Sequence, residues 1–169
     1  MKELATATIE IEDTQYILAA TEKGLAYFGV LENSYETLPK FFKGYSVSEN
    51  PEMLTVYIQP IKDYFTNQNN QFTFPLDLVG TEFQKEVWQE LLQVQYGTIT
   101  NYSELAEKIG RPTAVRAVAN AVGRNPLLII VPCHRVLGKD GSLTGFRGGL
   151  PLKRKLLKIE GLDYSQIKR

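Results

Sequence analysis

The stretch RAVANAVGRNPLLIIVPCHRV, at residues 116–136, holds most of the features that decide the fold and the chemistry of this chain. It begins with small and β-branched residues around one charge, Arg116, and this pattern predicts a helix that ends at Val122, before Gly123. Asn125-Pro126 then marks a turn. The apolar run LLIIV, at residues 127–131, predicts a buried strand.

The one cysteine and the one histidine of the chain, Cys133 and His134, follow this run directly after Pro132. Only a few per cent of an ordinary thiol is ionised at neutral pH, so a nucleophilic Cys133 needs a base, and His134 is the only imidazole. Neighbours in a strand point to opposite faces, so their contact requires a bend or a bridging water. Residues 81–169 hold eight carboxylates that could orient the imidazole, and spacing alone selects none of them. A buried, inert thiol is the alternative interpretation.

Composition narrows the function classes. The 169 residues are 43% hydrophobic and 22% charged, as in ordinary globular proteins. One cysteine excludes an internal disulfide, and one cysteine with one histidine is too few for a Cys/His zinc site. The net charge of zero hides a split: residues 1–80 carry 11 acidic and 5 basic groups, whereas residues 81–169 carry 8 acidic and 14 basic groups. The split favours an anionic partner for the second half, although two mutually attracting halves would explain it too.

The first half is expected to be sheet followed by helix. Period-two alternation and tight turns predict three short antiparallel strands within residues 5–31. Apolar residues spaced helically over residues 51–66 predict a helix that Pro60 should kink or split. We place the domain boundary after these elements, giving domains at residues 1–78 and 79–169.

The second half is expected to be mainly helical. Thr81 and Gln84 form a capping-box pattern before a helix whose apolar stripe includes Trp88, which we expect in the core. Two short helices, at residues 102–109 and 113–122, suggest a helix-turn-helix. Pro151 begins a final helix, on which Lys153 is expected to face solvent.

These segments resemble the O6-alkylguanine-DNA alkyltransferases. The matching motifs are GTEFQKEVW, YGTITNYSELA, RAVANAVGRNP, VPCHRV, GFRGGL and KIEG, which span nearly all of residues 80–161. The resemblance implies an α/β (α+β) fold with two domains. The first would be ribonuclease H-like, with a small antiparallel sheet, and the second winged-helix-like, with the helix-turn-helix.

The resemblance also implies catalytic roles. Cys133 matches the residue that accepts the alkyl group, His134 matches its base acting through a water, and Glu160 matches the carboxylate that orients the histidine. Tyr102 matches a tyrosine that assists base rotation and offers a proton to guanine N3. The pocket for the alkylated guanine would be formed by Asn125, Val136, Phe146 and Arg147.

The implied partner is double-stranded DNA that carries O6-alkylguanine. Arg116 matches an arginine that fills the space left in the base stack, on a helix that lies in the minor groove. The residues expected at the DNA are Tyr102, Thr113, Ala114, Arg116, Ala117, Asn120 and Arg124. No cofactor and no metal are expected, because the ligands that hold a structural zinc in some relatives are missing here.

The predicted function is therefore irreversible, single-turnover repair of O6-alkylguanine, with O4-alkylthymine as a further substrate class, by a monomer. The alternatives are a non-catalytic sensor of alkylated DNA or a helix-turn-helix DNA-binding protein, and a Cys-dependent hydrolase. Cys133 argues against the alkyltransferase-like proteins, which lack this residue. Without an apolar run of about 20 residues or a signal peptide, the chain is expected to be cytoplasmic, or nuclear in a eukaryote, and not membrane-bound.

Overall fold

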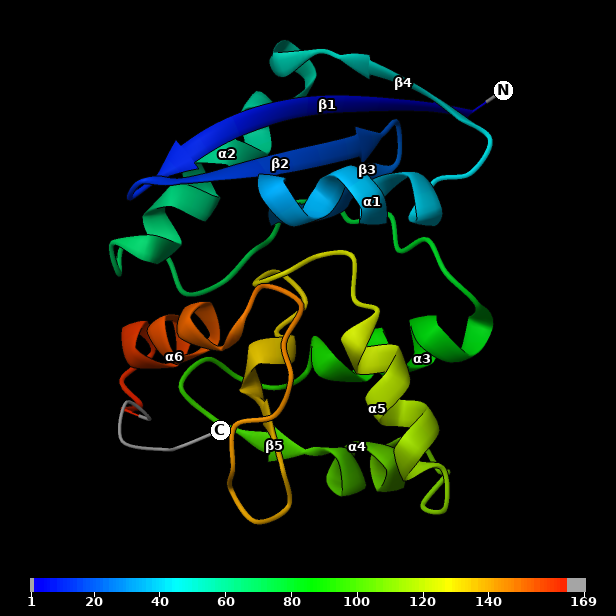
Figure 1. The fold of residues 1–169 in the computed structure, drawn as a ribbon, viewed down its shortest axis with the longest axis vertical. Helices are drawn as coiled ribbons and strands as arrows, with labels where there is room; N and C mark the ends of the chain where they lie inside the picture. The colour runs from blue at the N-terminus through cyan, green and yellow to red at the C-terminus, as the bar shows by residue number, and fades with distance from the viewer. Residues whose placement is uncertain (1, 164–169) are drawn as a thin grey trace. The chain divides into compact units, whose positions relative to one another are not determined.

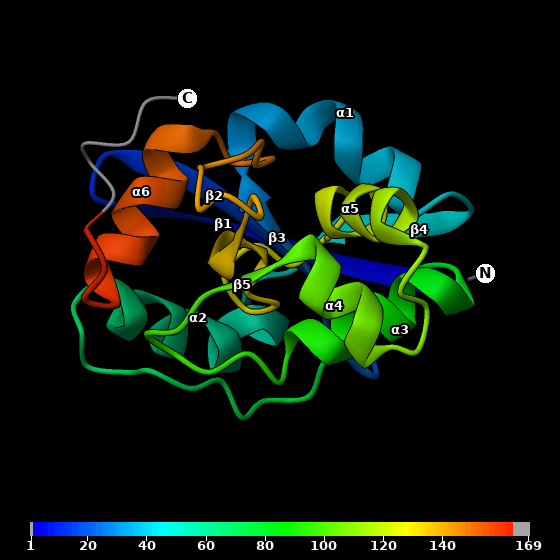
Figure 2. The same ribbon diagram turned by 90° about the horizontal axis from the view of Figure 1, so that it is seen from below.

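The computed structural model describes residues 2–163 and is a mixed α/β protein with a small sheet (Figures 1 and 2). The chain divides into two compact units, Met1–Val79 and Gly80–Arg169, which we call the N-terminal and the C-terminal unit. The division lies one residue beyond the boundary placed from the sequence. In the described part of the chain, no helix is both long enough and apolar enough to cross a membrane.

The N-terminal unit is built on a four-stranded sheet. Its strands are β1 (Lys2–Ile11), β2 (Thr14–Thr21), β3 (Gly24–Val30) and β4 (Tyr45–Glu49), in the order β3-β2-β1-β4. The three predicted strands and their antiparallel pairing are confirmed. The fourth strand, β4, pairs parallel to β1 and was not predicted from the sequence. This strand has five residues and is largely exposed, so its brief alternation of Tyr45 and Val47 with serines is a weaker signal than that of the longer strands.

Two helices cover opposite faces of this sheet. They are α1 (Leu31–Phe41), which was not predicted from the sequence, and α2 (Pro51–Phe65). Consecutive residues of a strand point to opposite faces, and in β3 the Tyr27 hydroxyl lies 2.8 Å from Ser34 Oγ of α1. The next residue, Phe28, stacks on Tyr16, whose ring contacts Phe65 of α2.

Pro60 does not split the helix that contains it. α2 runs unbroken from Pro51 to Phe65, so of the two predicted effects of Pro60 the split is absent, and the kink stays a prediction. A proline in a helix leaves the carbonyl four residues earlier without its usual donor. That carbonyl belongs to Val56, which is 63% exposed, so water can replace the missing donor.

The C-terminal unit is mainly helical. Its elements are α3 (Glu82–Leu91), β5 (Thr100–Asn101), α4 (Tyr102–Lys108), α5 (Val115–Gly123), the 3₁₀ turn η1 (Cys133–Arg135), β6 (Val136–Leu137) and α6 (Leu150–Ile159). The two-residue strands β5 and β6 pair in parallel. Helices α4 and α5 follow one another through a short turn, as the helix-turn-helix prediction requires. Trp88 of α3 is fully buried, and its indole N–H donates to the Ala121 carbonyl of α5 at 2.9 Å.

The capping box at the start of α3 gives a stability prediction. The Gln84 amide donates to Thr81 Oγ1 at 3.1 Å, and the Thr81 amide donates to Gln84 Oε1 at 3.0 Å. Thr81→Ala is expected to lower the free energy of unfolding by about 1 kcal/mol, because it removes one of these acceptors. Urea unfolding measures the change. Thr55→Ala, within the exposed part of α2, is the control, and an equal loss in both variants would contradict the capping role.

The apolar run at residues 127–131 is not a strand. It folds into successive turns, in which the Ile130 amide donates to the Leu128 carbonyl at 2.8 Å and the Val131 amide to the Leu127 carbonyl at 3.0 Å. Ile129 has φ 74°, a left-handed conformation that is strained for a β-branched residue. All five residues are buried, which explains why they are apolar. An apolar run indicates burial, but it does not distinguish a strand from a compact coil.

Candidate active site

Cys133 begins the 3₁₀ turn η1, directly after the coil that replaces the predicted strand. Its amide donates to the Val131 carbonyl at 2.7 Å, and the residue is 5% exposed. The bend expected at Pro132 is present, so Cys133 and His134 are not alternating residues of a strand. A strained coil fixes the position of the thiol.

Asn125 connects this coil to the thiol. Its Nδ2 donates to the Val131 carbonyl at 2.8 Å and lies 3.1 Å from Cys133 Sγ, while its Oδ1 accepts from the Leu127 amide at 2.9 Å. The side chain is buried. An amide donor at this distance stabilises a thiolate more than a thiol, so Asn125 favours ionisation of Cys133.

His134 and Glu160 form a buried pair. His134 Nε2 lies 2.6 Å from Glu160 Oε2, and both side chains are inaccessible to solvent. A carboxylate at Nε2 favours the tautomer with its proton there, which leaves Nδ1 as the acceptor nitrogen of the neutral ring. The structure therefore brings together the histidine and the one carboxylate, of eight, that the resemblance implied.

Burial keeps the thiol and the imidazole neutral. It raises the pKa of Cys133, and this is opposed by the Asn125 hydrogen bond and by the Arg147 and Lys153 cations. Burial also lowers the pKa of His134, against the opposite effect of Glu160. At neutral pH the site thus holds a protonated thiol and an unprotonated base, the starting state for base-assisted nucleophilic chemistry.

A small cavity of about 50 Å³ opens onto the thiol. Its lining includes Tyr102, Asn125, Leu128, Cys133, Phe146 and Arg147. The Tyr102 hydroxyl lies 2.7 Å from Thr144 Oγ1, and burial raises its pKa. Arg147 donates from Nη2 to the Asn125 carbonyl at 2.7 Å and so connects two parts of the lining.

Val136 and Lys153 differ from their expected positions. Val136 is fully buried and its carbonyl accepts from Lys153 Nζ at 2.6 Å, so of the four residues expected at the alkylguanine it is the one outside the described cavity lining. The prediction that Lys153 faces solvent is wrong, since the residue is 1% exposed. A signal existed in the sequence: Lys153 lies three residues before Leu156, on the apolar face of α6.

Most of the residues expected at DNA lie along one side of α5 and the turn before it. Thr113, Arg116, Ala117, Asn120 and Arg124 are all exposed, and Ala114 is half-buried. The opposite side of α5 is buried through Val118, Ala121 and Val122. Tyr102, at the start of α4, instead lines the cavity beside Cys133.

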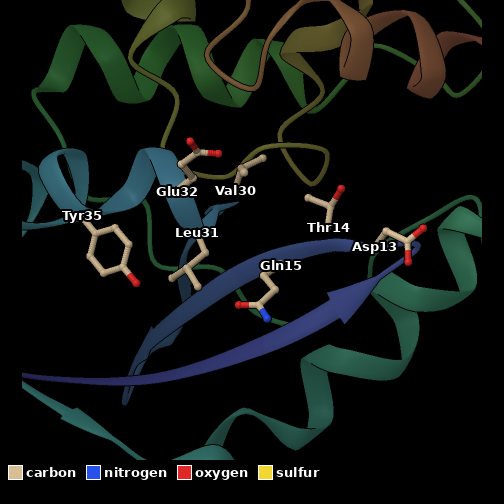
Figure 3. Close-up of a pocket in the computed structure, with 7 residues that line it drawn as sticks. All are labelled: Asp13, Thr14, Gln15, Val30, Leu31, Glu32 and Tyr35. Atoms are coloured by element: carbon tan, nitrogen blue, oxygen red, sulfur yellow. The ribbon is translucent and has the colours of Figure 1, made fainter.

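A larger pocket, of about 380 Å³, lies in the N-terminal unit at the β1–β2 turn and the start of α1 (Figure 3). Its lining consists of Asp13, Thr14, Gln15, Val30, Leu31, Glu32 and Tyr35 and contains neither thiol nor imidazole. Among residues 2–163, no cluster of three or more His, Cys, Asp or Glu side chains is arranged to hold a metal ion. The candidate active site is therefore the smaller cavity at Cys133 and not this larger pocket.

Comparison with known proteins points to the same chemistry. Residues 82–162 match the model of the 6-O-methylguanine DNA methyltransferase, DNA binding domain. The inducible methylated-DNA–protein-cysteine methyltransferase of Bacillus subtilis is 42% identical over 160 residues, which cover 92% of this chain and 89% of the relative. The methylated-DNA–protein-cysteine methyltransferase of Methanosarcina acetivorans is 42% identical over 86% of this chain and 90% of its own.

Solved structures also match most of this chain. The O6-methylguanine methyltransferase of Mycobacterium tuberculosis matches with a TM-score of 0.82 and 38% identity, over 93% of this chain and 92% of that one. The structure of the same organism's OGT in complex with DNA matches with a TM-score of 0.79 and 34% identity, over 97% of each chain. The identity and coverage, together with the thiol, imidazole and carboxylate at this site, show that the chain belongs to the methylated-DNA–protein-cysteine methyltransferase family.

Proposed function

We propose that this protein repairs O6-alkylguanine in double-stranded DNA by moving the alkyl group irreversibly to Cys133. The observation that carries the proposal is the convergence at one cavity of Cys133, Asn125 and Tyr102, with the buried His134–Glu160 pair in the same unit. The names of the relatives, and the complex of one of them with DNA, support the same activity.

The chemistry balances without a cofactor. The alkylated base leaves the helix, since the thiol cannot reach its alkyl carbon within the stack. His134 Nδ1 takes the Cys133 proton through a water, and Sγ forms a bond to the alkyl carbon as the bond from that carbon to O6 breaks. The electron pair stays on guanine, and the Tyr102 hydroxyl gives a proton to N3, so that the base leaves neutral. The thioether product ends the reaction after one turnover.

DNA would be held by the C-terminal unit. The exposed residues of α5 would face the minor groove, with Arg116 filling the gap in the base stack. Helices α4 and α5 and the short β5–β6 pair support a winged-helix-like description of this unit, and the four-stranded sheet with its two helices supports a ribonuclease H-like description of the other. We propose a monomer, because one unit carries both the reactive thiol and the DNA-facing helix.

Intact mass measurement tests the function. The protein is incubated with a duplex that contains one O6-methylguanine and is then mapped by peptide. A mass gain of one methylene on the Cys133 peptide, saturating at one equivalent, is expected. Tight lesion binding without a mass gain would point to a non-catalytic sensor, and turnover of an ester would point to a hydrolase.

The size of the cavity gives a prediction about Arg147. About 50 Å³ is far below the roughly 300 Å³ of ordinary ligand pockets, so the lining must move to admit a base. Arg147→Ala removes the side chain that bonds across this lining to Asn125. It is expected to speed reaction with O6-benzylguanine over O6-methylguanine by on the order of tenfold in the rate ratio.

Competing single-turnover reactions on the two bases give this ratio directly. A ratio is informative because any effect of Arg147 on the thiol itself acts on both substrates equally. Lys139→Ala, an exposed cation in the same loop region, is the control. An unchanged ratio in Arg147→Ala would show that this side chain does not limit alkyl size.

A further inference from the structure

The environment of Glu160 contains more than the histidine. Its Oε2 lies 2.6 Å from His134 Nε2, and its Oε1 accepts from the Gly97 amide at 3.0 Å. Arg135 adds a two-pronged contact, from Nε to Oε1 at 2.8 Å and from Nη2 to Oε2 at 3.0 Å. Both oxygens of this buried carboxylate therefore interact with a guanidinium and with one further donor group.

Arg135 is itself rigidly held. It is 7% exposed, its Nη1 donates to the Val94 carbonyl at 2.6 Å, and its guanidinium lies 5.7 Å from the centre of the Tyr96 ring. Tyr96 in turn donates to the Ile159 carbonyl at 3.1 Å, beside Glu160. The segment that follows α3 is thereby fastened to the end of α6 around one charge pair.

A buried carboxylate beside a histidine has two ways to be neutralised. Without another cation it can draw a proton onto the imidazole, which would then no longer be able to accept one. A guanidinium cannot lose its proton in a protein, so a bidentate arginine neutralises the carboxylate and leaves the imidazole unprotonated. Arg135 has the geometry for this second arrangement.

We propose that Arg135 is a positioning residue that acts through Glu160: it neutralises the carboxylate, fixes its orientation and thereby keeps His134 as an unprotonated base for Cys133. The inference rests on the proposed function, because it assigns Arg135 a place in the same alkyl transfer. It makes Arg135 part of the proton path rather than only a packing contact of the turn η1.

The charged groups that act on His134 come from two elements: Glu160 and Lys153 from α6 and its end, and Arg135 from η1. Two further titratable groups lie close by, Cys133 in η1 and Tyr96 in the segment after α3, where the charge of Glu160 raises the pKa of Tyr96. Arg135 and Lys153 lower the pKa of His134, whereas Glu160 raises it. Loss of Arg135 therefore leaves Glu160 to raise this pKa with less opposition.

The single histidine allows a direct test. In ¹H NMR titrations of the free protein, the ring proton of His134 reports its protonation without overlap from another imidazole. Arg135→Met is expected to raise the pKa of His134 by about one pH unit over wild type. The acid limb of Cys133 alkylation by iodoacetamide should move upward with it, so the rate at a pH on that limb falls by up to about tenfold.

Two further variants keep the test decisive if Arg135→Met does not fold. Arg135→Met with Glu160→Gln removes both charges and is expected to return the pKa of His134 to a value at or below that of wild type. Arg135→Lys keeps the cation and should recover most of the wild-type alkylation profile. A high His134 pKa in the double variant, or no recovery in a folded Arg135→Lys, would overturn the proposal.

Arg111→Met is the matched control, since Arg111 also pairs with a carboxylate, Glu86, and lies over an aromatic ring, Phe83, but is exposed. It should leave the His134 titration unchanged. Equal pKa values in wild type and folded Arg135→Met would assign Arg135 a purely structural role. Neither the His134 titration nor the reaction with iodoacetamide needs DNA. If wild type fails to repair alkylguanine, that failure can therefore be distinguished from a failure of the Arg135 proposal.

Discussion

Cys133→Ser is expected to abolish alkyl transfer completely while leaving binding to the lesion duplex intact. The substitution keeps the size of a side chain that is only 5% exposed, so the coil around it has no reason to rearrange. A serine hydroxyl is far less acidic than a thiol, and a neutral imidazole is too weak a base to ionise it for attack on an alkyl carbon. Intact mass measures transfer, and fluorescence anisotropy of a labelled duplex measures binding.

This variant also separates the proposed repair from a non-catalytic sensor. In both cases the folded protein binds DNA, but only repair loses an activity when the sulfur is removed. Wild-type protein on an unmodified duplex is the control for lesion preference. Residual transfer to the Cys133→Ser chain would place the acceptor elsewhere and contradict the mechanism.

The sequence predicted the site better than it predicted the structure around it. Cys133 and His134 are the only residues of their types, so their chemistry could be inferred from composition. Glu160 could not be selected by spacing among eight carboxylates, because the contact depends on how α6 ends beside η1. Only the resemblance pointed to it, and the 2.6 Å contact with His134 agrees.

The errors have a common physical cause. The apolar composition of residues 127–131 predicts a strand, but the run is a buried coil held by Asn125 and by its own turns. The charge of Lys153 predicts an exposed side chain, although its position on α6 is that of a core residue. In both cases local patterns report burial and polarity, whereas the positions depend on contacts between segments distant in sequence.

Replacement of the buried Lys153 is also expected to have a large effect on repair, because this residue places a positive charge near Cys133. Its Nζ donates to the Val136 carbonyl at 2.6 Å and to the Thr144 carbonyl at 3.4 Å, and it lies 6.0 Å from the centre of the Phe146 ring. It therefore connects β6 to the loop before α6, at a point two residues before Phe146 of the cavity lining. It also lowers the pKa of Cys133, against the larger effect of burial.

Lys153→Met is expected to slow repair by on the order of a hundredfold. The substitution both lowers the fraction of Cys133 that is ionised and removes the hydrogen bonds that hold the loop beside the cavity. Without the cation, the pKa of Cys133 rises further, which by itself lowers the fraction of thiolate at neutral pH. Lys153→Arg retains a cation and should recover part of the rate. Lys158→Met, an exposed lysine of the same helix, is the control for single-turnover kinetics.

The free energy of unfolding distinguishes an electrostatic role of Lys153 from a general loss of folding in Lys153→Met. Burial lowers the pKa of Lys153 to about 8, so the folded state disfavours its charge by roughly 3 kcal/mol at neutral pH. This cost is fully present below pH 8 and disappears as the pH rises to the ordinary lysine value, about 10.4. The free energy of unfolding of wild type and of Lys158→Met should therefore rise over this interval, relative to Lys153→Met.

At neutral pH, Lys153→Met loses two hydrogen bonds but is relieved of the buried charge, so its stability should stay near that of wild type. A slow variant that is also grossly unstable, or one that shows the same rise in alkali as its control, would contradict an electrostatic role for Lys153.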